Sequence, residues 1–184
     1  MINVYDFDKT IYNGDSTIDF YLYCLKKQPS IVLLLPKQIL AFGKYKLKLK
    51  EKEYFKEIFF SFLKKIHNID DKVEDFWLNN KSKIKAWYHE QKSNTDVIIS
   101  ASPEFLLKPI CDELKVNLIA TKVDKNSGAF KSKNCYGQEK VIRYKKEVNK
   151  KINKFYSDSL SDKPMMDLAK EKYLVKGNKL KVIE

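Results

Sequence analysis

The fold class follows first from the stretch Ile2-Asn3-Val4-Tyr5-Asp6-Phe7-Asp8-Lys9-Thr10. It begins as a short apolar run that ends in an acid, which is typical of a buried strand in a parallel sheet. Open α/β sheets bind ligands beyond the carboxyl ends of such strands. Because two carboxylates at a strand end repel each other, a bound cation is the natural resolution. We therefore expect chemistry at Asp6 and Asp8, and a loop with solvated acids is the alternative.

Working outward, three more runs have the character of buried strands. They cover residues 96–100, 117–121 and 154–157, and each is separated from the next by a stretch long enough for a helix. Alternation of strand and helix predicts an α/β fold with a parallel sheet. The end of the chain, residues 173–184, has two short apolar stretches around Lys176-Gly177-Asn178 and predicts a hairpin.

Residues 15–92 interrupt this alternation, because they contain no clear strand. Their apolar side chains follow the three-and-four spacing of amphipathic helices. We expect a helical cap at 15–92, inserted into a core formed by residues 1–14 and 93–184. The cap's aromatic stripe is most simply its packed interior, and it comprises Tyr54, Phe55, Ile58, Phe59, Phe62, Leu63 and Ile66.

Composition restricts the classes of partner. The 184 residues carry 36 Lys and Arg against 24 Asp and Glu, a formal charge of +12, which favours anionic partners. The excess is mostly lysine, without the aromatic interleaving of a single-strand binding groove, so we expect no nucleic-acid partner. Cys24, Cys111 and Cys135 lack metal-ligand spacing and suit a reducing cytosol. The N-terminal sequence lacks the pattern of a secretory signal, and no window is apolar enough for a spanning helix, so we expect a cytoplasmic protein.

Two further segments carry polar groups that suit phosphate. Ser100-Ala101-Ser102-Pro103 ends the second apolar run, and its hydroxyl and backbone amides suit a phosphoryl oxygen. A serine before a turn is, alternatively, a helix cap. Lys140 near the start of a predicted helix is able to neutralise a transferring phosphoryl group, although in so lysine-rich a chain a solvated side chain is the simple alternative.

The last segment of this kind is Ser157-Asp158-Ser159-Leu160-Ser161-Asp162-Lys163-Pro164, where an apolar strand again runs into a pair of acids. If the turn becomes helical, both carboxylates lie on one face. Asp158 and Asp6 would then hold one Mg²⁺ from adjacent strands, because magnesium is satisfied by one or two carboxylates with waters and substrate phosphate.

Together these motifs resemble the haloacid dehalogenase (HAD) superfamily of phosphatases, in the phosphoserine phosphatase-like subfamily IB. Asp-x-Asp-x-Thr, Ser, Lys and Asp-Ser-x-x-Asp-x-Pro occur in the family's order. The resemblance covers residues 1–14 and about 93–184, and it implies a Rossmann-like three-layer core with an inserted helical cap. Lys9 departs from the glycine that many relatives have, and we expect that departure to be harmless.

The resemblance also implies roles for individual residues. Asp6 would be the nucleophile and a metal ligand, and Asp8 the general acid and base as well as a ligand through its carbonyl. Mg²⁺ would be the cofactor and Asp158 its third protein ligand. A carboxylate at Asp8 argues against dehalogenation, which needs no acid. Asp162 would orient the metal ligands or Lys140, and phosphoryl oxygens would be held by Thr10, Ser100, Ala101 and Lys140.

The substrate is less determined. Asp15 stands where phosphoserine phosphatases have a glutamate that meets the substrate amine, but it would equally cap a helix. The run Gln28-Pro29 followed by apolar residues resembles the phosphatidylglycerophosphatase C family more closely, although Lys37 and Lys44 make stable membrane insertion doubtful. We expect either a phospholipid or lysophospholipid headgroup, with peripheral contact at the inner face of an anionic membrane, or a soluble phosphomonoester such as phosphoserine. A non-catalytic phosphate-binding protein and a phosphotransferase are the alternatives from other classes.

Overall fold

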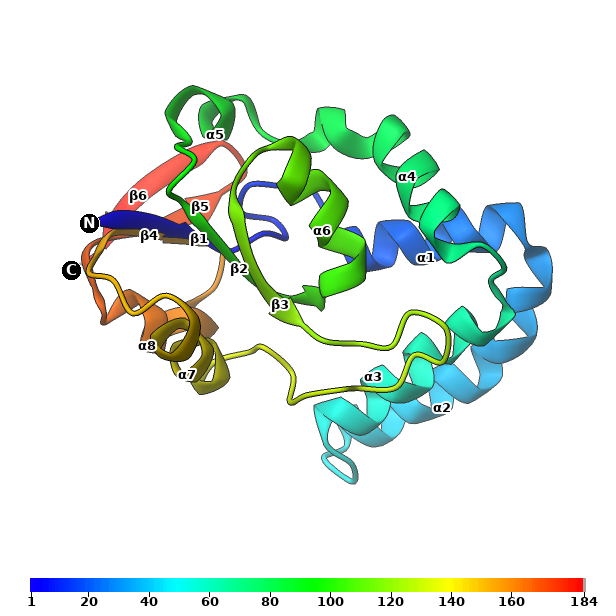
Figure 1. Cartoon of the computed structure of the whole chain (residues 1–184). Coiled ribbons are helices and arrows are strands. Elements are labelled where there is room, and N and C mark those ends of the chain that lie inside the picture. The colour runs from blue at the N-terminus through cyan, green and yellow to red at the C-terminus, as the bar shows by residue number, and fades with distance from the viewer. Residues whose placement is uncertain (184) are drawn as a thin grey trace.

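The computed structural model describes residues 1–183, which contain a single six-stranded sheet (Figure 1). The strand order is β3-β2-β1-β4-β5-β6, and every neighbouring pair is parallel except the terminal β5–β6 hairpin. The α/β fold with a parallel sheet is confirmed. The strands are β1 (Ile2–Tyr5), β2 (Val97–Pro103), β3 (Asn117–Thr121), β4 (Ile152–Ser157), β5 (Ala169–Lys176) and β6 (Lys179–Ile183).

The strands alternate their side chains between two apolar layers, which makes the core three layers thick. Val97 and Ile99 of β2 pack on one face with residues of α7 (Gln138–Glu147) and α8 (Lys163–Met166). Ile98 lies on the opposite face, in a cluster with residues of α6 (Glu104–Glu113).

Between β1 and β2 the chain is helical (Figure 1). Figure 1 shows α1 to α4 gathered beyond one end of the sheet. Short 3₁₀ turns cover Pro29–Leu34, Ser61–Lys65, Lys81–Lys83 and, after β4, Leu160–Asp162. The helices are α1 (Ser16–Lys27), α2 (Leu35–Lys46), α3 (Lys52–Phe60), α4 (Ile69–Asn80) and α5 (Ala86–Gln91).

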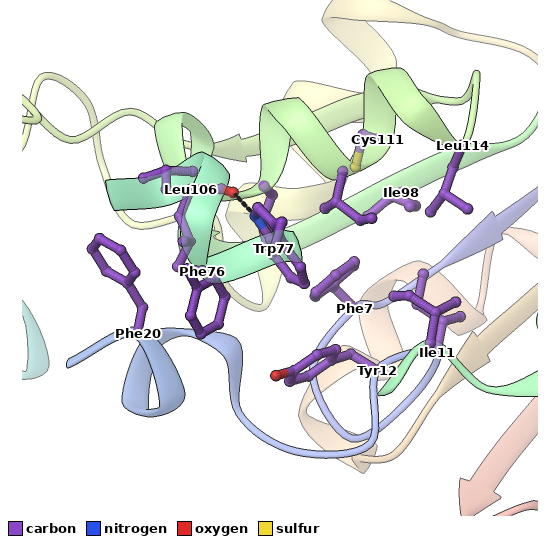
Figure 2. Close-up of a cluster of buried hydrophobic side chains, with 14 of the residues drawn as sticks. Phe7, Ile11, Tyr12, Phe20, Phe76, Trp77, Ile98, Leu106, Cys111 and Leu114 are labelled. Atoms are coloured by element: carbon purple, nitrogen blue, oxygen red, sulfur yellow. Dashed lines mark hydrogen bonds between the residues drawn. The ribbon is translucent and has the colours of Figure 1, made fainter. Parts of the chain in front are cut away.

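One apolar cluster joins these helices to the sheet (Figure 2). Trp77 of α4 packs edge-on against Phe7 in the turn after β1, and its indole N–H donates to the Leu106 carbonyl of α6 at 2.6 Å. Phe20 of α1 meets Phe76 of α4 edge to face, with ring centroids 5.4 Å apart. α1 and α4 are therefore fixed to the sheet by shared packing; the cap bounds of 15–92 stay a prediction.

The C-terminal hairpin forms around Gly177, whose φ of 58° suits glycine. Its first strand begins at Ala169, four residues before the predicted hairpin, because β5 also pairs in parallel with β4. Cys24, Cys111 and Cys135 are free thiols buried in apolar surroundings.

Candidate active site

The predicted site residues lie where the strand order reverses, beside β1, with β2 on one side and β4 on the other. A cavity of about 370 Å³ opens at this end of the sheet. Among the predicted site residues, only Thr10 is absent from its lining. Those that line it are Asp6, Asp8, Asp15, Ser100, Ala101, Lys140, Asp158 and Asp162.

Lys140 is the central cation of the site. Its side chain is 2% exposed, and its Nζ donates to Asp6 Oδ1 and to Asp162 Oδ2, each at 2.7 Å. Ser157 Oγ donates to the same oxygen of Asp162 at 2.9 Å. Burial lowers the pKa of Lys140, but Asp6 and Asp162 outweigh it, so the net pKa is raised. Lys140 is therefore held as a charged group against Asp6.

Asp6 sits directly beyond β1 with both carboxylate oxygens occupied. Thr10 Oγ1 donates to its Oδ2 at 3.3 Å, and that hydroxyl also accepts the Asp158 amide at 2.9 Å. Burial raises the pKa of Asp6 to about 7, against the opposing charge of Lys140 and with a further rise from Asp162. Since Thr10 is fully buried, its hydroxyl joins the loops after β1 and β4; the phosphoryl contact predicted for it stays a prediction.

The turn between Asp6 and Asp8 depends on a left-handed backbone at Lys9. The φ of Lys9 is 59°, in the region that favours glycine. The Lys9 amide donates to the Gly14 carbonyl at 2.8 Å, and its carbonyl accepts Lys85 Nζ at 2.8 Å. The turn thus closes with a lysine at a backbone cost of about 1–2 kcal/mol.

Asp8 is held by donors from two elements. The Ser16 amide, at the N-terminus of α1, donates to Oδ1 at 2.6 Å, and Ser102 Oγ of β2 donates to Oδ2. Thr17 Oγ1 lies 2.9 Å from Ser102 Oγ. Burial, followed by the charge of Asp15, raises the pKa of Asp8 to about 6 although these hydrogen bonds oppose the shift. A carboxyl with this pKa is able to give and take a proton near neutral pH.

Asp15 caps α1: its side chain accepts the Ile18 amide at 3.1 Å. It also lines the cavity. The capping alternative is thus seen directly, and the substrate contact stays a prediction.

Ser100 and Ala101 lie on β2, facing the same cavity. The Ser100 side chain accepts the Ser102 amide at 3.1 Å, so it orders the bend that aims Ser102 at Asp8. The Ala101 carbonyl accepts Thr121 Oγ1 of β3 at 3.0 Å. These contacts fix the end of β2 beside Asp8.

The donor set fits a magnesium ion. Four carboxylates (Asp6, Asp8, Asp158, Asp162) line one end of the cavity, and Lys140 contacts only Asp6 and Asp162 among them. Burial raises the pKa of Asp158 as well, so a cation beside this carboxylate would be favourable. Within residues 1–183 no group of three acidic, His or Cys side chains is placed to hold a metal. The carboxylates of Asp6 and Asp158 with the Asp8 carbonyl would therefore need water and phosphate oxygens to complete the shell, as Mg²⁺ accepts.

Lys56 is a cavity residue that sequence reasoning missed. Its Nζ donates to the Ala101 carbonyl at 2.9 Å and to Asn134 Oδ1 at 2.8 Å. Burial, and then the nearby Lys52, lower the pKa of Lys56 to about 8. The Lys52 ammonium in turn lies 3.7 Å from the centre of the Tyr136 ring. The only sequence signal was the spacing of Lys52, Lys56 and Phe60 along one side of a helix.

The rest of the α3 side of the cavity is apolar. Phe55, Phe59 and Phe60 line it, with Ile18 of α1. Gly128 packs closely against the backbone of Phe60 from the opposite side. A Cβ at Gly128 would lie 2.3 Å from the Phe60 carbonyl oxygen, so this approach requires a glycine. The site thus pairs an acidic and basic floor with an apolar wall.

Comparisons with known proteins identify a family and solved structures with a similar fold. Residues 4–167 match the model of the haloacid dehalogenase-like hydrolases. Similar solved structures include a protein of unknown function from Bordetella pertussis Tohama I (16% identity, 93% of this chain and 87% of that chain, TM-score 0.74). A phosphoserine phosphohydrolase-like protein from Francisella tularensis subsp. tularensis SCHU S4 is also similar (16% identity, 94% of this chain and 86% of that chain, TM-score 0.60). So is phosphoserine phosphatase in its apo form (14% identity, 93% of this chain and 84% of that chain, TM-score 0.50). No curated protein gives a significant match.

Proposed function

Because the chain belongs to the haloacid dehalogenase-like hydrolase family, we propose that it is a magnesium-dependent phosphomonoester hydrolase that works through an aspartyl-phosphate on Asp6. The observation that carries the proposal is the meeting of Asp6, Asp8, Lys140 and Asp158 in one cavity. Asp6 and Asp8 follow β1, Asp158 follows β4, and Lys140 lies on α7, 134 residues after Asp6. One reaction uses all four residues.

In the first step a carboxylate oxygen of Asp6 attacks phosphorus, and the bond from phosphorus to the ester oxygen breaks. Asp8, whose pKa of about 6 leaves part of it protonated near neutral pH, gives its proton to the leaving oxygen. The products of this step are the free alcohol and a phosphorylated Asp6.

In the second step a water molecule attacks the same phosphorus and Asp8 takes its proton. The bond from phosphorus to Asp6 breaks, which releases inorganic phosphate and restores both acids. Lys140, 2.7 Å from Asp6, offsets negative charge at the attacking oxygen throughout. Mg²⁺, held by the groups described above, would polarise the phosphoryl oxygens and position them for in-line attack.

The side chains that line the cavity restrict which organic group the substrate carries. Phosphatidylglycerophosphate is one candidate, which would place the enzyme at the inner face of a membrane, and a soluble phosphomonoester such as phosphoserine is the other. The apolar wall of Phe55, Phe59 and Ile18 favours a substrate with apolar character over phosphoserine. Residues 15–92 would act as the cap that closes over it.

Phosphate release tests the proposal. We would measure it with Mg²⁺ and with EDTA from phosphatidylglycerophosphate, phosphoserine, sugar phosphates and a chromogenic aryl phosphate. Asp6→Asn should abolish release, and Asp112→Asn, an exposed acid of α6, should leave it unchanged. Binding of phosphate compounds without turnover would instead support a non-catalytic binding protein. Transfer to added alcohols in place of water would support a phosphotransferase.

A further inference from the structure

We propose that the outer side of α2 and the turn before it dock on an anionic lipid bilayer, with the mouth of the cavity beside the membrane. This inference rests on the proposed function, because it assigns the phosphatase an amphiphilic substrate reached from a lipid surface. The docking surface, called the α2 face below, consists of Val32, Leu33, Ile39, Leu40, Phe42 and Leu47.

The α2 face is apolar and open. Leu33, Leu40 and Leu47 are 74%, 61% and 72% exposed. Leu40 lies on α2, Leu33 lies in the 3₁₀ turn before it, and Leu47 directly follows its last residue. Nine of the seventeen exposed large apolar side chains among residues 1–183 fall between Ile18 and Leu49. So dense a grouping marks an interaction surface, since single exposed apolar residues are otherwise scattered.

The charges around the α2 face indicate that it binds an anionic surface. Residues 20–50 contain seven lysines and no Asp or Glu. Lys37, Lys46 and Lys48 are exposed within or next to the apolar stripe. Exposed leucines flanked by lysines are the pattern of a helix that lies in the interface of an anionic membrane. A second copy of this chain would bring lysines against lysines, so self-association is disfavoured.

The helices set the depth of contact. Among residues 1–183, none has the length and apolar composition to cross a bilayer. Gln38 and Ala41 on the inner side of α2 are buried, and Gln38 donates to the Phe59 carbonyl at 3.0 Å. Since this inner side is fixed to α3, only the outer side is free to enter the lipid, and the contact is peripheral.

The α2 face continues into the cavity. Phe42 is 43% exposed, and its ring centroid lies 5.3 Å from that of Phe55, which lines the cavity. Ile18, at the cavity mouth, is followed one helical turn later by the exposed Leu22. A substrate with its phosphate at Asp6 would meet Phe55, Phe59 and Ile18 on its way out along this wall, beside the lysines Lys52 and Lys56 of α3. The substrate class is therefore a phosphomonoester of an amphiphile.

Vesicle co-sedimentation at physiological salt tests the docking without any need for turnover. The wild-type chain should pellet with vesicles of phosphatidylglycerol and phosphatidylcholine in equal parts and stay in the supernatant with phosphatidylcholine alone. The triple substitution Leu33→Ser/Leu40→Ser/Leu47→Ser should lower the partition coefficient at least about tenfold. The matched control Leu78→Ser/Ile142→Ser/Val182→Ser removes equally exposed apolar groups elsewhere and should leave it unchanged.

Two further variants separate charge from apolar contact. Lys37→Gln should lower partitioning about fivefold. Gly43→Leu should raise it, because a Cβ at Gly43 has no neighbouring atom within 4 Å. The leucine triple should hydrolyse a soluble chromogenic phosphate as the wild type does, so a failed phosphatase and a failed docking surface give different results. Wild type that stays with the supernatant of anionic vesicles, equal loss in the control triple, or a leucine-dependent dimer in sedimentation velocity would each overturn the proposal.

Discussion

Replacement of Lys140 by methionine removes the cation that pairs with Asp6 and Asp162 in the site. The ammonium contacts two carboxylates at 2.7 Å, and the exposed fractions of the Lys140, Asp6 and Asp162 side chains are 2%, 12% and 4%. Removal of one partner from a buried pair costs about 3–5 kcal/mol, because the remaining charge is desolvated and unpaired. We expect Lys140→Met to lose that much free energy of unfolding at pH 7, a large share of the roughly 5–15 kcal/mol of a typical domain.

The assay is urea unfolding in EDTA, followed by the fluorescence of Trp77 and Trp87. Lys146→Met, an exposed position on the same helix, is the control and should change stability by less than about 0.5 kcal/mol. Lys140→Met/Asp162→Asn should regain part of the loss, because one of the two unpaired charges is gone.

The loss should also depend on pH with a definite sign. The folded-state pKa of Asp6 is already raised to about 7, and removal of the opposing Lys140 raises it further. An acid with a raised folded-state pKa favours the folded state when protonated, so that contribution is present at low pH and disappears as pH rises. The deficit of Lys140→Met should therefore grow from pH 5 to pH 8. A deficit below about 1 kcal/mol, or one that is equal at the two pH values, would refute this account of the network.

Asp8→Asn should lower kcat by about 10²–10⁴-fold on alkyl phosphates, and far less on an aryl phosphate whose leaving group needs no proton; equal losses on both substrates in steady-state kinetics would count against an acid role. Lys56 should titrate near pH 8 by NMR of its side chain, whereas a solvent-exposed lysine titrates at about 10.4; a normal titration would contradict the burial of its ammonium. Phe76→Ala should cost about 3–5 kcal/mol in urea unfolding, because Phe76 is fully buried, whereas the exposed Leu78→Ala on the same helix should cost less than about 0.5 kcal/mol.

The strands and the acids that follow them could be predicted because both depend on local sequence. The run Asn117–Thr121 was predicted to the residue, and Asp6 and Asp158 follow β1 and β4 where acids after apolar runs were expected. A buried parallel strand shows in sequence as an uninterrupted apolar segment. The rule that ligands bind at the carboxyl ends of strands then places the acids together without knowledge of the contacts.

The contacts across the cavity could not be predicted, because they join segments far apart in the chain. Ser102 and Thr17 are 85 positions apart, and nothing in either neighbourhood indicates that they meet beside Asp8. Lys56 is one of many lysines, and only the fold distinguishes it from solvated ones. The two hydrogen bonds of the Thr10 hydroxyl, to the Asp6 carboxylate and from the Asp158 amide, likewise join separate segments, while its predicted phosphoryl contact stays a prediction.

The exposure of the α2 face could not be predicted from the sequence either. An apolar run at residues 31–42 is compatible with an inner helix of a cap as well as with a surface. Only the burial of Gln38 and Ala41, with Leu33 and Leu40 turned outward, shows which side is free.

Phosphorylation of Asp6 during turnover is tested by trapping the phosphoryl group on the enzyme. The enzyme would be mixed with substrate and Mg²⁺, quenched in acid during turnover, treated with borohydride, which reduces an acyl phosphate to an alcohol, and digested for mass spectrometry. We expect homoserine at position 6 in the wild type and in Asp8→Asn, and none in Asp6→Asn or in enzyme without substrate. Continued phosphate release with an unmodified Asp6, or reduction at another carboxylate, would contradict it.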